Sequence, residues 1–512
     1  MIDEREMSNE KESMFYRFLS FVERIGNKLP HPFTLFVILT VLMVLVSFVT
    51  GIAGIQVTHP TDGSNVSARN LLSGEGIEYM ILNLISNFTG FRPLGLVLGM
   101  MLGIGLAEKA GLMSAFMKKF MLGAPEKLLL GAIFLIGICG NIASDAAVII
   151  VPPLAGAIFY GTKRNPLVGI AAGYAAASAG FTANLLIAGT DALLAGITEE
   201  AAQSMQAGIT ISPAVNYYFM VVSTFVLTVV GAWVTQKFVE PQAGEYVAEQ
   251  EIEDDGDLSV SDQQSKGLKN AGIVTVLYWA LVVAAIIPQG SPLRGPGGSL
   301  IPSTFLSGIV PFILFWFIAI GIAYGKTVGT IKSEADVPRL MGEAIKDMAG
   351  YIVLVFIIAQ FVSYFNWTNL GMILAVKMAD LLEIFNFTGF PMVVGVIAVS
   401  MFINLFIGSG SAKWALLSPV FVPMFMMLDH SPAFAQLAYR IGDSTTNAIT
   451  PLFPYFPIVL GFMKRYDEDS GIGTVISYIM PYTIAFGVVW IILLAIWYFA
   501  DLPIGPGAGI FL

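Results

Sequence analysis

Long apolar stretches recur along the whole chain, and nine of them are long enough to cross a membrane as helices. A helix needs about 20 residues to span the roughly 30 Å of hydrocarbon in a bilayer. The predicted spans are residues 32–55, 93–112, 166–197, 213–238, 271–288, 302–324, 349–367, 434–462 and 475–500. Only 12% of the 512 residues are charged, about half the share in a soluble protein. The sequence therefore predicts an all-α polytopic membrane protein.

Two further apolar blocks, 128–160 and 391–428, are each interrupted by small and polar residues, GNIASD at 140–145 and GSGSAK at 408–413. Lysine and arginine concentrate on the cytoplasmic side of membrane proteins. With the N-terminus inside and the C-terminus outside, 20 of the 26 basic residues are cytoplasmic and four lie outside. Both ends of the first block are then cytoplasmic and both ends of the second lie outside. The arms, about 12 to 16 residues long, favour two re-entrant hairpins over ordinary helix pairs.

The two hairpins resemble each other and enter from opposite sides. Aligning Ser144 with Ser411 also aligns a proline in each hairpin, and a span broken by polar residues follows each one, FTAN at 181–184 and STTN at 444–447. Paired interruptions in inverted halves indicate a transporter's midplane site. We divide the chain into an N-terminal interfacial helix (1–30), a first half (31–238), an acidic cytoplasmic linker (239–268) and a second half (269–512).

Several kinds of site are excluded by composition. One cysteine, Cys139, and three histidines rule out a disulfide framework and a Cys/His metal centre. Acidic residues outnumber basic ones by 36 to 26, so no nucleic-acid partner is expected. The polar N-terminus is not that of a cleavable signal peptide. We expect no cofactor beyond a Na⁺ ion, and no P-loop indicates an ATP-driven pump.

Four segments resemble one family of transporters. GNIASDAAVIIVPPLAG (140–156), TANLLIAGTDALLAGI (182–197), GSGSAKWALLSPVFVPMFMML (408–428) and YRIGDSTTNAITPLFPYFP (439–457) are similar to the p-aminobenzoyl-glutamate transporter (AbgT) family. The resemblance implies nine spans with two hairpins, a homodimer in the bacterial inner membrane, and cation-coupled movement of p-aminobenzoyl-glutamate or related aromatic compounds. Some members export sulfonamides. The hairpins more distantly resemble sodium-coupled dicarboxylate transporters.

Charged residues inside apolar blocks mark the candidate site, because a charge at the bilayer centre is costly. Arg440 and Asp443 lie three residues apart and share a helix face. They either form a structural ion pair, or Arg440 binds a substrate carboxylate bidentately and frees Asp443 to bind a proton or Na⁺. Lys413 lies beside the second tip, and Asp145 and Asp191 lie near the interruptions of the first half.

Trp414 follows the second tip directly and is expected to stack on an aromatic substrate. The resemblance to the family implies that Ser411, Asn404 and Pro432 accompany it at the substrate site, with Asp191 as a coupling residue. Oxygen-bearing side chains near the two interruptions are candidate Na⁺ ligands: Asn141, Ser144, Asn184, Ser409 and Asn447. Alternatively, these groups only satisfy broken backbone, and a proton-only mechanism uses the aspartates.

Three functions remain open from the residues. A cation-coupled carrier of an aromatic carboxylate is favoured, because Trp414 and a single buried arginine suit an aromatic monoanion. A sodium-coupled dicarboxylate carrier is the second possibility. A membrane-embedded enzyme is the third, but it needs a nucleophile with a buried partner, and Lys413 with Ser411 makes a poor dyad. We therefore predict a transporter and not an enzyme, with the direction of transport undetermined.

Overall fold

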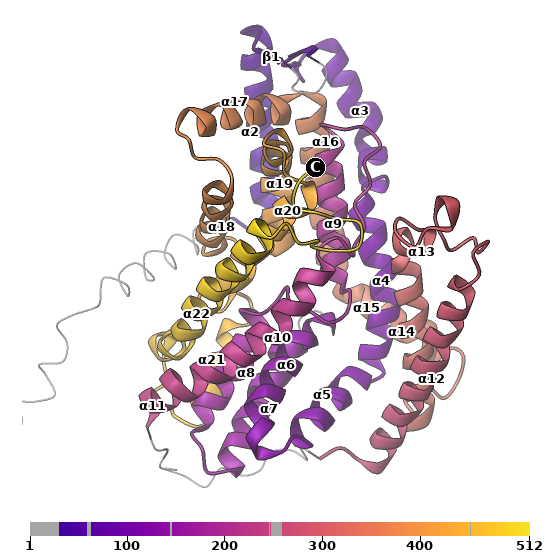
Figure 1. Ribbon diagram of the computed structural model, residues 1–512, viewed down its shortest axis with the longest axis vertical. Coiled ribbons are helices and arrows are strands. Elements are labelled where there is room, and N and C mark those ends of the chain that lie inside the picture. The colour runs from indigo at the N-terminus through magenta and orange to yellow at the C-terminus, as the bar shows by residue number, and fades with distance from the viewer. Residues whose placement is uncertain (1–29, 59–62, 144–145, 245, 247–258, 451) are drawn as a thin grey trace, which may run out of the picture.

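The protein is built almost entirely of helices (Figure 1). The computed structural model describes residues 30–512 except 59–62, 144–145, 245, 247–258 and 451. Three predicted features lie outside the described residues: the interfacial helix up to residue 29, residues 245 and 247–258 of the acidic linker, and Ser144 and Asp145 at the first tip.

Up to residue 243, the described part of the chain is mostly helical. The helices are α2 (Pro32–Ile52), α3 (Gly74–Thr89), α4 (Arg92–Lys109), α5 (Leu112–Leu122), η1 (Glu126–Leu128), α6 (Leu129–Cys139), η2 (Gly140–Ala143), α7 (Ala146–Gly161), α8 (Pro166–Ser178), α9 (Gly189–Ala202), α10 (Tyr217–Val234), η3 (Thr235–Val239) and α11 (Glu240–Ala243). Between α2 and α3, strands β1 (Gln56–Thr58) and β2 (Asn65–Ser67) pair antiparallel, with Val57 opposite Val66.

From residue 262 onward the chain is again mostly helical. The helices here are α12 (Asp262–Ile286), η4 (Pro296–Gly298), α13 (Thr304–Ser307), α14 (Ile309–Val328), α15 (Asp336–Asp347), α16 (Ala349–Trp367), α17 (Leu370–Ile384), α18 (Phe390–Asn404), α19 (Gly410–Met427), α20 (Pro432–Asn447), α21 (Phe456–Lys464) and α22 (Ile472–Phe499). The first predicted hairpin thus corresponds to α6 and α7, and the second to α18 and α19.

Seven of the nine predicted spans contain a continuous helix that is long and apolar enough to cross a membrane, within the described part of the chain. These helices are α2, α4 (continuous with α3), α10, α12, α14, α16 and α22. The other two predicted spans are interrupted, 166–197 into α8 and α9, and 434–462 into α20 and α21. The all-α polytopic fold is confirmed, whereas the count of nine spans and the re-entrant course of the hairpins stay predictions.

Proline and side-chain caps start the helices that carry the site. Asn165 accepts a hydrogen bond from the Leu167 amide at the start of α8, and Ser431 accepts one from Phe434 at the start of α20. Both helices have proline at their first position, where the absent N–H would have no helical partner. Pro432, predicted at the substrate site, is this first residue of α20.

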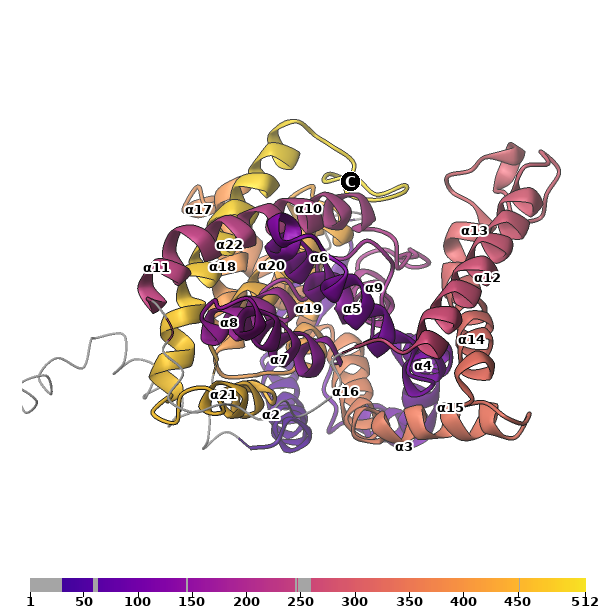
Figure 2. The ribbon, with the colours of Figure 1, turned by 90° about the horizontal axis from the view of Figure 1, so that it is seen from below.

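The interrupted helices form the centre of the molecule. Every residue of α8 and of α20 is buried, and α19 packs against both α9 and α20 (Figure 1). Helices α12 and α14 form a separate pair at one side, seen from below in Figure 2, and α14 joins it to the centre through α4. Polar residues in the central helices are therefore surrounded by protein rather than by lipid, as helix breaks at membrane depth require.

Candidate functional site

Two buried ion pairs converge on α20. Arg440 Nη2 lies 2.6 Å from Asp191 Oδ1 on α9, and Lys413 Nζ on α19 lies 2.6 Å from Asp443 Oδ1. None of the four side chains is more than 9% exposed. Of the two alternatives for Arg440 and Asp443, the ion pair between them is not formed, because α20 packs against both α9 and α19 and each residue pairs with a different neighbour.

The guanidinium of Arg440 is only partly satisfied. Its Nη2 also donates to the Thr182 carbonyl at 2.8 Å, but Nε and Nη1 are buried with no hydrogen-bond partner among the described groups. Buried donors without partners are costly and rare. Both two-donor edges of this planar fork include Nη2, so a carboxylate that displaces Asp191 from Nη2 can accept two parallel hydrogen bonds, one of them from Nε or Nη1.

Residues 179–188, between α8 and α9, hold the Arg440–Asp191 pair in place. Thr182 Oγ1 lies 2.6 Å from Ser444 Oγ, and Ser444 donates to the Arg440 carbonyl at 2.8 Å. Asp191 accepts a hydrogen bond of 2.7 Å from the Ala188 amide at the start of α9. A carboxylate is favoured at the positive end of a helix, so the backbone break and the helix end together stabilise Asp191.

The second pair has more hydrogen-bond partners. Lys413 Nζ also donates to Asn404 Oδ1, and Tyr439 donates to Asp443 Oδ1 at 3.2 Å. The Asn404 amide nitrogen lies 2.6 Å from the Asp443 carbonyl and 2.9 Å from Asn447 Oδ1. Asn404 was predicted to bind substrate. In this conformation, both the oxygen and the nitrogen of its side-chain amide are already hydrogen-bonded within the protein.

Trp414 lies next to this pair and is completely buried. Its ring stacks on Tyr439 with centroids 4.6 Å apart and an interplanar angle of 25°. Its Nε1 donates to Thr198 Oγ1 at 2.9 Å, which lies 2.7 Å from Gln436 Oε1. The Gln436 amide nitrogen donates in turn to Asn216 Oδ1 at 2.9 Å. The ring expected to stack on substrate is thus fixed by an aromatic partner and a buried hydrogen-bond chain.

Two predicted substrate residues, Ser411 and Pro432, and the predicted Na⁺ ligand Ser409 are not in either ion pair. Ser409 caps α19 by accepting from the Ala412 amide at 3.4 Å, and its hydroxyl lies 3.3 Å from that of Ser411. Both hydroxyls are at the second tip, four and two residues before Lys413. Pro432 precedes Arg440 by eight residues, about 12 Å along α20, so it does not lie beside the guanidinium.

The predicted Na⁺ ligands differ in how far their oxygens are engaged. Asn447 Oδ1 accepts from Asn404, and Asn184 Oδ1 accepts from the Leu186 amide at 3.3 Å. Asn141 Oδ1 is buried without a hydrogen-bond partner in the described structure, while its amide nitrogen donates to the Ile138 carbonyl. Among the described candidates, Asn141 is the one with a buried oxygen still available. The described residues hold no cluster of three His, Cys, Asp or Glu side chains.

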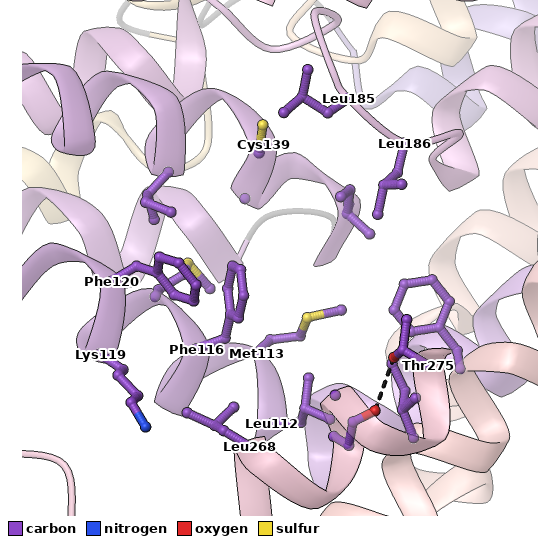
Figure 3. Close-up of a pocket in the computed structure, with 18 of the residues that line it drawn as sticks. Leu112, Met113, Phe116, Lys119, Phe120, Cys139, Leu185, Leu186, Leu268 and Thr275 are labelled. Atoms are coloured by element: carbon purple, nitrogen blue, oxygen red, sulfur yellow. Dashed lines mark hydrogen bonds between the residues drawn. The ribbon is translucent and has the colours of Figure 1, made fainter. Parts of the chain in front are cut away.

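A large apolar pocket of about 740 Å³ lies beside the first tip (Figure 3). It is enclosed by α5, α6, α12, α14 and residues 185–186, with Lys119 and Lys269 in its lining. Gly140 and Leu185 take part in the lining, but neither ion pair nor Trp414 does. The pocket therefore adjoins the broken segment of the first half and is not lined by the charged groups of the two ion pairs.

Several functional candidates were missed from sequence. Thr198 and Asn216 are single polar residues in separate segments, and Gln436 and Tyr439 lie three residues apart on α20, where nothing in the sequence relates them to the other two. Lys413 was recognisable, since it and Arg440 are the two basic residues that the topology places inside the membrane.

Comparison with known proteins agrees with this architecture. The family described as "AbgT putative transporter family" matches residues 17–512. The p-aminobenzoyl-glutamate transport protein of Escherichia coli (strain K12) is 43% identical over 492 residues, covering 96% of each chain.

Two solved structures are similar over nearly the whole chain. The YdaH transporter of Alcanivorax borkumensis has a TM-score of 0.88 at 37% identity, covering 93% of this chain and 100% of that one. MtrF of Neisseria gonorrhoeae, described as illuminating a class of antimetabolite efflux pumps, has a TM-score of 0.90 at 40% identity, covering 96% of this chain and 100% of that one. These relatives are transporters, which confirms the predicted transporter and removes the membrane-embedded enzyme. The chain belongs to the AbgT family of multi-pass membrane transporters.

Proposed function

We propose that the protein is a cation-coupled secondary transporter of p-aminobenzoyl-glutamate or a related aromatic carboxylate in the bacterial inner membrane. The observation that carries this proposal is the buried Arg440 guanidinium, with two donors unpartnered among the described groups and one ion pair to Asp191. The similarity to the Escherichia coli p-aminobenzoyl-glutamate transport protein supports the choice of substrate.

In this proposal, the substrate carboxylate accepts hydrogen bonds from Arg440 Nη2 and from one of the two free donors, Nε or Nη1. Binding weakens the ion pair to Asp191, and the released carboxylate takes up a proton or a Na⁺ ion. Asp443 is a second coupling position, since it is also buried and paired. The aromatic part of the substrate packs near Trp414 and Tyr439 once the enclosing segments move. Movement of one charge across 100 mV supplies about 2.3 kcal/mol, which supports a roughly fortyfold concentration ratio.

A specific observation favours export as the direction of transport. MtrF is described with a class of antimetabolite efflux pumps and is 40% identical to this chain, so sulfonamides that resemble p-aminobenzoate are candidate exported substrates. We also propose cytoplasmic N-termini and external C-termini, following the distribution of basic residues. A homodimer is proposed from the resemblance to the family alone.

Flux in proteoliposomes tests the proposal. Purified protein is reconstituted, and radiolabelled p-aminobenzoyl-glutamate is followed under a proton gradient alone, a Na⁺ gradient alone and no gradient. We expect uphill accumulation under at least one gradient, and the effective gradient identifies the coupling ion. Succinate is added as a competitor: strong inhibition of the flux would indicate a dicarboxylate carrier instead of the proposed carrier of aromatic carboxylates. Absence of flux under every gradient would reject the proposal.

A further inference from the structure

The apolar pocket beside the first tip is open to the surroundings of the protein (Figure 3). It lies between the α12–α14 pair on one side and α5 and α6 on the other. Phe116 and Phe120 of α5 line it with their ring centroids 4.4 Å apart, and these side chains are 39% and 54% exposed. Aromatic surface of this size is removed from water favourably, so the pocket is suited to an apolar occupant.

Polar side chains in the wall of the pocket are satisfied by the protein itself. Thr275 Oγ1 donates to the Ala271 carbonyl at 2.9 Å and accepts a hydrogen bond from Trp316 Nε1 at 3.1 Å. Cys139 adds only a thiol, which is a weak donor. Apart from two lysines, the described wall therefore offers no strong side-chain hydrogen-bonding group to the body of a ligand.

These two lysines, Lys119 and Lys269, bring positive charge to the pocket. Lys119 lies near the end of α5, and Lys269 lies in the first third of α12. Both are exposed, and neither forms an ion pair with another described residue. In Figure 3 the Lys119 side chain extends away from Cys139. Because α5 and α12 pack against each other, one apolar pocket is flanked by two ammonium groups that need an anionic partner.

An amphiphile with an anionic head complements both parts of the pocket. Basic pockets between membrane helices on the cytoplasmic side bind the headgroups of anionic lipids, and the topology proposed above assigns both lysines to that side. An aromatic carboxylate that contains an amide, such as p-aminobenzoyl-glutamate, would instead bury that amide against a wall without partners for it, which is costly. The chemistry of the wall therefore favours a lipid over the proposed substrate.

We propose that the pocket is a binding site for an anionic phospholipid of the cytoplasmic leaflet. An acyl chain lies against the apolar side chains of α5, α12 and α14, and the phosphate lies between Lys119 and Lys269. Gly140 and Leu185 also line the pocket, so the lipid fills the space next to the interrupted segments of the first half. This site is separate from the two buried ion pairs, and the inference does not depend on the identity of the transported substrate.

The chain contains its own reporter for occupancy of the pocket. Cys139 is its single cysteine, it lines the pocket, and it is partly exposed. Purified full-length protein, stripped of lipid in dodecyl maltoside, is treated with N-ethylmaleimide, and alkylation is followed by intact-protein mass spectrometry. Dioleoyl phosphatidylglycerol and dioleoyl phosphatidylcholine are titrated separately, because they have the same chains but only the first has a net negative charge.

At about ten times its Kd, phosphatidylglycerol should slow the alkylation of Cys139 about tenfold, because about a tenth of the sites remain open. Phosphatidylcholine should slow it little at the same concentration. Lys119→Gln and Lys269→Gln should each raise the concentration of phosphatidylglycerol needed for protection about fivefold. Lys118→Gln and Lys266→Gln remove the same charge from the same two helices outside the pocket lining, and they should stay near the wild type.

Three results would overturn the proposal. Equal protection by the two phospholipids would show that the pocket does not select an anionic head. Equal behaviour of the four lysine variants would show that Lys119 and Lys269 do not hold the phosphate. Protection by p-aminobenzoyl-glutamate but not by phosphatidylglycerol would assign the pocket to the substrate.

Gly272 provides a second reporter if Cys139 is not alkylated under any condition. It lines the pocket on α12, and a Cβ added there would meet nothing within 4 Å, so Gly272→Cys presents its thiol to open space. The same titrations are made on Gly272→Cys, with the same expected order of the two lipids. Alkylation of Gly272→Cys that phosphatidylglycerol does not slow would reject the lipid site. Failure of p-aminobenzoyl-glutamate flux, in contrast, would reject the proposed function and leave these protection results intact.

Discussion

Arg440 on α20 and Asp191 on α9 form a buried ion pair, with Nη2 and Oδ1 2.6 Å apart, between the two halves of the chain. A buried pair that joins the two halves of a transporter can stabilise one conformation and be exchanged for a ligand in another.

Breaking the Arg440–Asp191 pair should lower the free energy of unfolding, and removing both charges should lower it less. Arg440→Gln and Asp191→Asn each leave a buried charge unpaired, which we expect to destabilise the protein by about 3–5 kcal/mol. The double variant should recover much of this loss, because no unpaired charge remains. Thermal unfolding of the four proteins in detergent forms a double-mutant cycle. Additive losses would show that the pair is not coupled in the folded protein.

Thr198 should affect substrate binding through the orientation of Trp414. Thr198→Val preserves the shape of the side chain but removes the acceptor of the 2.9 Å bond from Trp414 Nε1. An unpartnered buried donor costs about 1–3 kcal/mol, so we expect roughly a tenfold or greater increase in the KM for p-aminobenzoyl-glutamate. Thr198→Ser, which retains the hydroxyl, is the control and should stay near the wild type. Equal KM values for Thr198→Val and the wild type would contradict this role.

Acid should destabilise the connection between α19 and α20 through His430. Burial lowers the pKa of His430 below its usual value, against smaller raising effects of a backbone hydrogen bond with Leu428 and of Asp429. The unfolded chain therefore binds the proton more readily. The stability contributed by neutral His430 is complete above the unfolded pKa of about 6.5 and declines as the pH falls below it.

The ring of His430 stacks on Phe434 and Tyr498, so His430→Phe is an apolar replacement of similar shape. Unfolding temperatures measured from pH 5.5 to 7.5 should fall towards acid less steeply in His430→Phe than in the wild type. Identical pH profiles for the two proteins would show that His430 does not contribute.

The crossing of α4 and α14 depends on a glycine. A Cβ added at Gly103 would lie 2.5 Å from the Leu314 carbonyl oxygen, whereas one at Gly99, one turn earlier, meets nothing within 4 Å. Gly103→Ala should destabilise the protein by about 1–3 kcal/mol through overpacking. Gly99→Ala should be neutral or stabilising by up to about 1 kcal/mol. The same unfolding temperature for both variants would mean that α4 and α14 can move apart at this crossing without loss of stability.

Hydropathy predicted the helical spans well, because bilayer thickness sets their length and composition. It predicted their ends poorly: the span expected to begin at residue 271 lies in α12, which begins at Asp262. Ser261 and Gln264 form a capping box there, and these polar turns extend the helix beyond the apolar stretch. Helix ends depend on local hydrogen bonds, which a hydrophobicity count does not include.

The members of the site were easier to predict than their partners. A charge inside an apolar block is visible in sequence, so Arg440, Asp443, Asp191 and Lys413 were all identified. Which charge pairs with which depends on the elements that pack around α20, and the spacing of Arg440 and Asp443 on one helix left open a pair that the structure does not form. The Thr198 hydrogen-bond chain had no sequence signal, since its members come from separate segments.

The central claim is that Arg440 binds the carboxylate of an aromatic substrate during transport, and counterflow tests it most directly. Proteoliposomes loaded with unlabelled p-aminobenzoyl-glutamate are diluted into a trace of the radiolabelled compound, with no ion gradient imposed. The wild type should accumulate the label transiently, while Arg440→Lys, which keeps the charge but loses the planar fork, should exchange it at least about tenfold more slowly. Counterflow by Arg440→Lys at the wild-type rate, or none by the wild type, would contradict the account.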